Sequence, residues 1–451
     1  MSESLLDLAR SIAARAEPGE QVEAYVSRSR DTDVKVFEGA VEEFAVAESA
    51  GVGVRVIVDG RLGYAWAGSL DADVVADVLG EARDNARFAA PDEWNGLPTV
   101  DDARAIDAVD LELWRDDLMS VPTTDKVALA LELERATATR DARVRGVESA
   151  HYGDAAVESA VASSLGVESS ARRTICSCSV SALAGEGEGT RTGYGFSAGR
   201  TLAELEPEIA ATDAVDRSVR LLGARPIPSQ RLPVVFDPLV TRSLLGILGA
   251  ALNGEAMVKG RTMFLGREGE EVATPEFTLY DDPTNDLAFG ASTHDSEGLP
   301  TRKNALILDG QLLQFLQNTY TGRRSGKGST GSAVRGGYAT PPGVGSRALV
   351  LLPGEHTPEE ILAAVGDALY VQSVSGLHSG TNPVSGDLSL GAEGLLVRGG
   401  EFAEPVREVT IASTVPRMLQ DVADIGSDLV WLPGGAAGVT LLVGEMAISG
   451  V

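Results

Sequence analysis

The spacing of hydrophobic residues changes along the chain and separates helical from strand-like segments. Apolar residues at helical spacing predict an amphipathic helix at the N-terminus, capped by Ser2 or Ser4 and ended by Pro18-Gly19. The same spacing predicts further helices at 71–89, 124–139, 202–222, 238–252, 357–368 and 416–422.

Alternating apolar and polar residues predict strands in two groups. The first group comprises 21–29, 33–37, 41–48, 51–58, 61–67, 144–151, 155–165 and 168–183. The second comprises 232–236, 277–280, 305–308, 311–317, 347–352, 395–397, 406–411 and 439–449. The pairs Asp59-Gly60, Asp309-Gly310 and Gly399-Gly400 predict tight hairpin turns between strands.

Two interruptions of this pattern divide the chain. A polar stretch at 91–110 separates two parts of the first half, about 1–90 and 110–223. A proline-containing stretch at 224–230 predicts a domain linker, and 451 residues exceed what one core usually holds. We therefore expect an α+β fold, with an N-terminal α/β domain (1–225) whose sheet is mainly antiparallel. The C-terminal domain (226–451) should be a strand-rich, twisted sheet or barrel-like body.

Charge and composition exclude several classes of partner. The chain carries 66 Asp and Glu against 38 Lys and Arg, a net charge of −28, which disfavours nucleic acid and anionic lipid. No apolar run reaches the length of a membrane span, and no secretory signal is visible, so we expect a cytoplasmic protein that does not contact membranes. Four histidines and two cysteines limit zinc chemistry.

Three local motifs have a plain structural interpretation. The G-x-S-x-G match at 195–199 follows a polar glycine loop rather than the apolar strand of a nucleophile elbow. The basic loop at 322–331 fails the phosphate-loop spacing, and we expect a flexible surface loop that contacts an extended peptide or a partner through Ser329 and Thr330. Cys176 and Cys178 fit two small buried residues on one face of a strand, with a redox or metal pair as the alternative.

His294, Asp295 and Glu297 place three possible metal ligands within four residues. On a strand, Asp295 and Glu297 share one face and His294 takes the other, so the three cannot converge without a turn. We expect a turn with a solvated charge pair, and keep these residues as candidates for binding a peptide or partner. No H-E-x-x-H, H-E-x-x-x-H or C-x-x-C sequence occurs anywhere.

Several of these segments together resemble the TldD/PmbA family, and in particular its PmbA (TldE-like) branch. The segments are 36–44, 51–63, 292–301, Asp309-Gly310, 319–321, 329–331, 386–394 and 405–411. The resemblance implies a heterodimeric metalloprotease acting on unfolded or small peptides. In it, a TldD-like subunit holds the metal with an H-E-x-x-x-H helix and a cysteine near the C-terminus. The family is also described as modulators of DNA gyrase.

The same resemblance locates the metal motif, and its ligands are missing. The family pattern G-x-x-x-F-x-G-x-x-G-E falls at 260–270, and counting back places the motif on Leu245, Gly246 and Ala250. Neither Leu nor Ala binds zinc, Gly cannot act as a base, and 432–443 has no cysteine. We therefore expect no catalytic residue, metal or cofactor in this chain, and zinc in the TldD-like partner.

These observations lead to one main hypothesis and two alternatives. The chain is expected to be a non-catalytic subunit that docks on a TldD-like metalloprotease and holds an unfolded peptide by strand addition. A homodimer is possible when the chain is alone. The first alternative is an autonomous metallopeptidase that uses His294, Asp295, Glu297 or His378. The second is a regulatory protein that binds another protein.

Overall fold

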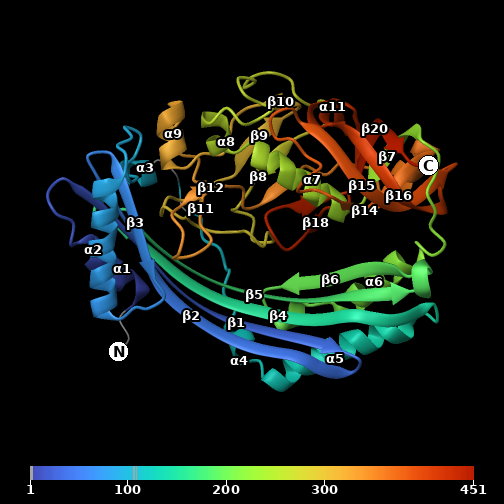
Figure 1. The fold of residues 1–451 in the computed structure, drawn as a ribbon, viewed down its shortest axis with the longest axis horizontal. Coiled ribbons are helices and arrows are strands. Elements are labelled where there is room, and N and C mark those ends of the chain that lie inside the picture. Colours follow the sequence, from blue (N-terminus) through green and yellow to red (C-terminus); the bar gives the residue numbers. More distant parts are fainter. Residues whose placement is uncertain (1–3, 105–106, 108) are drawn as a thin grey trace.

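A computed structural model of the chain describes residues 4–104, 107 and 109–451, so Ser2 and part of the polar stretch 91–110 lie outside the described residues. Six antiparallel strands form the first sheet, in the order β3-β2-β1-β4-β5-β6 (Figure 1). They are β1 (Glu20–Phe37), β2 (Ala40–Val58), β3 (Arg61–Ala67), β4 (Val144–Ser163), β5 (Glu168–Ala184) and β6 (Arg191–Gly199). The prediction of a mainly antiparallel N-terminal sheet is confirmed.

The long strands continue where the sequence predicts breaks. β1 covers both 21–29 and 33–37, and β2 covers 41–48 and 51–58. β4 covers 144–151 and the second predicted strand from 155 to 163, two residues short of its predicted end. Polar Arg30 still pairs with Glu48 on one side and Ala156 on the other. The predicted breaks are wrong because backbone pairing on both sides of β1 does not require an apolar side chain at each position.

Four helices cover one face of this sheet. They are α1 (Leu5–Ala13), α2 (Ala72–Phe88), α5 (Thr123–Arg140) and α6 (Pro207–Val219). The Ser4 hydroxyl caps α1 by accepting a hydrogen bond from the backbone of Asp7. The predicted helix at 202–222 instead begins at Pro207, after a short 3-10 turn (Leu202–Glu204), because proline belongs in the first helical turn. Two short helices, α3 (Val100–Arg104) and α4 (Asp116–Ser120), lie in the connection before α5.

The second half of the chain forms a barrel-like sheet, as predicted. Its strand order is β16-β15-β14-β7-β20-β17, and an additional pairing of β16 with β20 closes five of these strands on themselves. The strands are β7 (Gln230–Phe236), β14 (Ala368–Ser375), β15 (Asp387–Arg398), β16 (Glu401–Thr414), β17 (Val422–Ile425) and β20 (Leu441–Ser449). β14 was not predicted; the helix expected at 357–368 ends at Val365, and Gly366 adopts a positive φ of 73°.

Smaller elements surround the barrel. A four-stranded sheet has the order β10-β9-β8-β13, from β8 (Leu279–Asp281), β9 (Asn304–Leu308), β10 (Gln311–Leu312) and β13 (Leu349–Leu351). Two short pairs are β11 (Ala333–Val334) with β12 (Gly343–Val344), and β18 (Val430–Trp431) with β19 (Ala437–Gly438). The helices are α7 (Pro238–Ala251), α8 (Gly254–Val258), α9 (Thr319–Ser325), α10 (Pro358–Val365) and α11 (Val415–Gln420).

The strand predicted at 311–317 is shorter than expected. Only Gln311 and Leu312 pair with β9. Further on, the backbone N–H of Leu316 donates to the carbonyl of Leu252 instead. The sequence pattern is apolar in both places, so it does not show where the chain changes its hydrogen-bonding partner.

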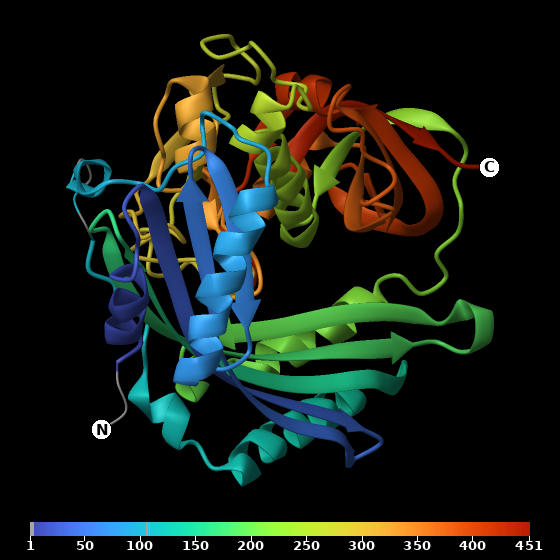
Figure 2. The same cartoon turned by 60° about the vertical axis from the view of Figure 1, so that its left-hand side comes forward.

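The C-terminal half lies over the helix-free face of the first sheet (Figure 1, Figure 2). Loops around 291–301 and 330–347 contact this face near β1, β2 and β3. Among the described residues, no helix combines the length and hydropathy needed to cross a bilayer. The contact between loops and sheet is where buried polar groups concentrate.

Candidate functional site

Helix α7 carries the positions to which the metal motif maps. Asp237 caps it by accepting from the backbone of Leu239, and Pro238 occupies its first turn. The Leu245 side chain is buried and borders an apolar cavity of about 30 Å³ together with Phe277 and Met418. The helix is therefore held by its apolar face against the core of the C-terminal half.

The three motif positions do not share one surface of α7. Leu245 faces the core, whereas Gly246 and Ala250 are exposed. Positions five apart on a regular α-helix differ by about 140° in direction, which agrees with this separation. No side chain at these positions has a nitrogen, oxygen or sulfur donor, so the residues present do not fit a zinc ion. In the ranges that the structure describes, no three His, Cys, Asp or Glu side chains lie close enough to hold a metal ion.

Residues 294–300 form a tight turn, as predicted. His294 pairs with Pro300, the N–H of Asp295 donates to the carbonyl of Leu299 at 2.7 Å, and Gly298 has a φ of 84°. The expectation of a solvated charge pair is wrong. Asp295 and Glu297 are both buried, because the turn lies between β1, β2 and the loop that follows α9.

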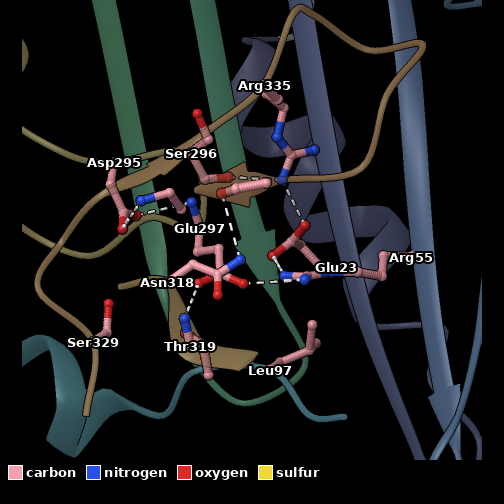
Figure 3. A network of polar contacts seen from close by, with 12 residues as sticks. Glu23, Arg55, Leu97, Asp295, Ser296, Glu297, Asn318, Thr319, Ser329 and Arg335 are labelled. Carbon is pink, nitrogen blue, oxygen red and sulfur yellow. Dashed lines mark hydrogen bonds and ion pairs between the residues drawn. The ribbon is translucent and has the colours of Figure 1, made fainter. Parts of the chain in front are cut away.

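Glu297 belongs to a buried ionic network that joins the two halves of the chain (Figure 3). Its Oε1 accepts from Arg55 Nη1 at 3.1 Å, and its Oε2 accepts from the N–H of Thr319 at 2.9 Å. Arg55 also donates to Glu23 at 2.5 Å, and Arg335 donates to the other oxygen of Glu23 at 2.8 Å. Burial opposes ionisation of Glu23, but the charges of Arg55 and Arg335 outweigh it and lower its pKa.

Asp295 stabilises its own turn. Its Oδ1 accepts from the backbone N–H groups of Glu297 (2.8 Å) and Leu299 (3.0 Å), and its Oδ2 accepts from that of Ala333 (3.1 Å). Burial and the neighbouring charge of Glu297 raise the pKa of Asp295 to about 7. Because both oxygens are engaged, this carboxyl group has little capacity left for a ligand.

The basic segment 322–331 is a surface loop only in part: Gly326, Lys327 and Gly328 are exposed, and hydrogen bonds fix the residues on either side. Its first residues belong to α9, where Asn318 and Thr321 form a capping box. Thr330 is buried, and its hydroxyl accepts from the backbone N–H of Gln317 at 2.7 Å. Ser329 accepts from the N–H of Gly331 at 3.1 Å. Both hydroxyl groups thus hold the loop in place beside the network.

A pocket of about 110 Å³ lies next to this network, between the first sheet and the loop at 291–296. From the sheet it is lined by Tyr25, Ser159 and Arg173, among others, and from the C-terminal half by His294, Asp295, Arg335 and Arg347. The Arg335 guanidinium stacks on the Tyr25 ring at 4.5 Å from its centroid. Burial lowers the pKa of His294.

Other candidate residues lie elsewhere. His378 is exposed in the loop between β14 and β15. Cys176 and Cys178 are free and buried against α5 and α6, as the simpler interpretation predicts, and burial raises their pKa values to about 12 and about 11. Ser197 lies within β6 and accepts from the N–H of Glu206 at 2.8 Å, so it is not on a nucleophile elbow.

The sequence did not identify Glu23, Arg55, Arg335 or Arg347 as site residues. Glu23 and Arg55 occupy polar positions of alternating strands, a pattern that predicts solvent exposure. They are buried because a loop from more than 200 residues further along the chain covers that face of the sheet. No local pattern indicates this.

Comparison with known proteins defines the class of protein. Models of PmbA/TldA metallopeptidase domain 1, the central domain and the C-terminal domain match residues 22–86, 116–222 and 229–450. Metalloprotease PmbA of Escherichia coli O157:H7 is 28% identical, covering 99% of this chain and 96% of that protein. A metalloprotease PmbA homolog of Haemophilus influenzae is 25% identical over 96% of this chain and 93% of that protein.

Solved structures show the same fold. TldE from Thermococcus kodakarensis superposes with a TM-score of 0.88 at 23% identity, covering 99% of both chains. A Thermotoga maritima protein described as a candidate modulator of a DNA gyrase gives a TM-score of 0.89 at 23% identity, over 98% of this chain and 99% of that one. The chain is a member of the PmbA/TldD metallopeptidase family, as the sequence predicts.

Proposed function

We propose that this chain is a non-catalytic partner subunit of a TldD/TldE-type heterodimeric metalloprotease that cleaves unfolded or small peptides. The observation that carries the proposal is the chemistry of α7. The helix is present, capped and packed, but Leu245, Gly246 and Ala250 stand where the family's metal motif maps. In this proposal, zinc and the catalytic base belong to the TldD-like subunit.

The turn at 294–300 supports the same division of roles. An autonomous metal site there would need free carboxylate oxygens, but those of Asp295 and Glu297 already accept from backbone N–H groups and Arg55. His294 is the first residue of this turn, and His378 lies in the loop between β14 and β15. No observation favours the autonomous alternative over the partner subunit.

The free edge of β2 is where we place strand addition by an unfolded peptide. β2 pairs with β3 only over Val52–Val58, so one side of residues 40–50 has no neighbouring strand among the described residues. Val41, Phe44 and Val46 are exposed there by 42%, 44% and 46%. An edge with unpaired backbone groups and apolar side chains favours binding an extended chain with little sequence preference.

The decisive experiment is reconstitution. This chain is purified alone and together with a TldD-like chain that carries H-E-x-x-x-H, and cleavage of an unstructured peptide is followed by mass spectrometry. We expect no cleavage by this chain alone, and cleavage by the mixture that a chelator abolishes. Robust, chelator-sensitive cleavage by the lone chain would disprove the proposal.

A matched pair of variants tests the edge. Phe44→Lys places a charge on the β2 edge, whereas Phe88→Lys changes a phenylalanine that is 90% exposed at the end of α2. We expect F44K to weaken peptide binding at least fivefold and F88K to leave it unchanged. Sedimentation of the lone chain tests whether two copies pair through the same edge. A dimer of the unmodified chain that F44K dissociates would show that a second copy, and not a peptide, binds this edge.

A further inference from the structure

We propose that the pocket between the first sheet and the loop at 291–296 binds a carboxylate group, and that this group is the C-terminal carboxylate of a peptide. The assignment of a peptide as its source rests on the proposed function. The carboxylate chemistry rests on the pocket itself. None of the family's motif positions on α7 lines it.

The first argument is unused hydrogen-bonding capacity. The Arg335 side chain is 1% exposed, and its Nη2 donates both to Glu23 and to the carbonyl of Ser296. Its Nε and Nη1, and Nε of Arg347, are buried and have no hydrogen-bond partner within the described part of the chain. Leaving buried guanidinium N–H groups unsatisfied is costly, and a carboxylate oxygen is a strong acceptor for each of them.

The second argument is an excess of positive charge. Arg172, Arg173, Arg335 and Arg347 line the pocket, and Arg335 is already paired with Glu23. The other three face one carboxylate in the lining, Asp295, whose oxygens are engaged by backbone N–H groups. Burial lowers the pKa of Arg347. The charge of Asp295 opposes this shift, and repulsion from Arg173 adds to it. A bound anion would relieve this repulsion, and the low local dielectric would strengthen the interaction.

The third argument is size and surroundings. A volume of about 110 Å³ accommodates a carboxylate and a small side chain but not a nucleotide. Apart from Tyr25 and His294, the rest of the lining is small or apolar, with Ala160, Val161 and Ala171 on the sheet side and Ala291 on the loop side. This combination of converging cations and small neutral residues suits the end of a peptide chain with little preference for its last side chain.

Binding of labelled peptides to the lone chain tests the proposal by fluorescence anisotropy. The probes are tetra-alanine with a free C-terminus, tetra-alanine amide, and Ala-Ala-Ala-Glu amide, which has a carboxylate only on its side chain. We expect the free acid to bind at least tenfold more tightly than tetra-alanine amide, and more tightly than the glutamate peptide. Equal binding of the acid and the amide would overturn the carboxylate site. Preference for the glutamate peptide would overturn its assignment to a chain terminus.

Arg173→Gln supplies the matched variant. Arg173 is exposed on β5, and its side chain makes no hydrogen bond or ion pair within the described ranges, so the protein should fold normally with glutamine there. We expect R173Q to weaken binding of the free acid about fivefold and to leave the amide unchanged. Arg145→Gln removes the same charge from β4 outside the pocket and should have no effect. An unchanged affinity of R173Q for the acid would refute the site.

Competition identifies other anions. Sodium acetate should displace the acid peptide. Binding of inorganic phosphate without any binding of the acid peptide would overturn the peptide assignment. Reconstitution separates the two proposals. If the mixed subunits cleave the peptide but the chain binds the free acid and the amide equally, only the carboxylate pocket is disproved. If the chain prefers the free acid through Arg173 but the mixture cleaves nothing, only the partner-subunit function is disproved.

Discussion

Buried charges are the most unusual residues in this molecule. Glu23, Arg55 and Glu297 are each at least nine-tenths buried and form direct ion pairs, at 2.5 Å between Arg55 and Glu23 and 3.1 Å between Arg55 and Glu297. Such pairs contribute little net stability when complete, but they are costly to break, because the remaining charge loses its partner in a low-dielectric environment. Each member should therefore be sensitive to substitution.

Glu297→Gln tests this sensitivity. The change removes a negative charge between Arg55 and the N–H of Thr319 and should lower the free energy of unfolding by about 3 kcal/mol. Glu158→Gln breaks a much more exposed pair, with Arg28, and should cost less than about 1 kcal/mol. Urea denaturation of both variants measures the difference. Similar small losses in the two would show that the network is not a stabilising contact between the halves.

Asp281 gives a pH-dependent prediction. Its Oδ1 accepts from the N–H groups of Arg347 (2.9 Å) and Ala348 (2.7 Å), and burial raises its pKa to about 6. The folded state thus binds a proton more tightly than the unfolded state. Its stabilising contribution is complete below about pH 4 and is lost as the pH rises through 6, by about 2–3 kcal/mol.

Asp281→Asn removes this titration while keeping an acceptor for the two N–H groups. Between pH 4 and 7, the unfolding free energy of the unmodified protein should fall relative to that of D281N. Asp77→Asn, at an exposed position of α2, should run parallel to the unmodified protein. Thermal unfolding across this pH range provides the measurement. If the difference in unfolding free energy between D281N and the unmodified protein does not change with pH, Asp281 keeps an ordinary pKa.

Within single elements, α7 shows how far packing restricts substitution. An added Cβ at Gly246 would meet no atom within 4 Å, whereas one at Gly249 would lie 2.6 Å from Leu349 Cδ1 and 2.9 Å from Ser346 Oγ. Gly246→Ala should therefore stabilise the protein by about 0.5–1 kcal/mol through helix propensity. Gly249→Ala should destabilise it by at least about 1 kcal/mol through overpacking. Denaturant midpoints of the two variants compare them directly, and the same sign of change in both would contradict the packing.

At this scale the sequence predicts element types well and their limits less well. The hairpin at Asp59-Gly60 and the cap at Ser4 follow from local chemistry and are confirmed. The breaks within β1 and β2 were wrong because pairing on neighbouring strands depends on distant residues. The burial of Glu297 was missed for the same reason: its ion-pair partner Arg55 is 242 residues away in sequence.

At the scale of the whole molecule, the predicted linker at 224–230 is not a free connection. Its residue Arg225 bonds through its N–H and carbonyl to Pro405 and Arg407 of β16, and the carbonyl of Ile227 accepts from Val451. At the opposite end, the network of Glu23, Arg55, Glu297 and Arg335 joins the first sheet to the C-terminal loops. Contacts at two separate places hold the halves together. We therefore expect the halves to keep their relative position when the chain between them is cut.

A cut chain tests this. A specific protease site is inserted between Pro228 and Ser229, within the predicted linker. The domain boundary itself stays a prediction. After cleavage, the two pieces should co-elute in size-exclusion chromatography at about 0.15 M salt and also at about 1 M salt, because buried ion pairs are screened far less than exposed ones. Glu297→Gln in the same cut protein should promote separation, and Glu158→Gln should not. Separation of the pieces without any substitution would show that only the covalent connection positions the two halves, and that the pocket between them forms only in the intact chain.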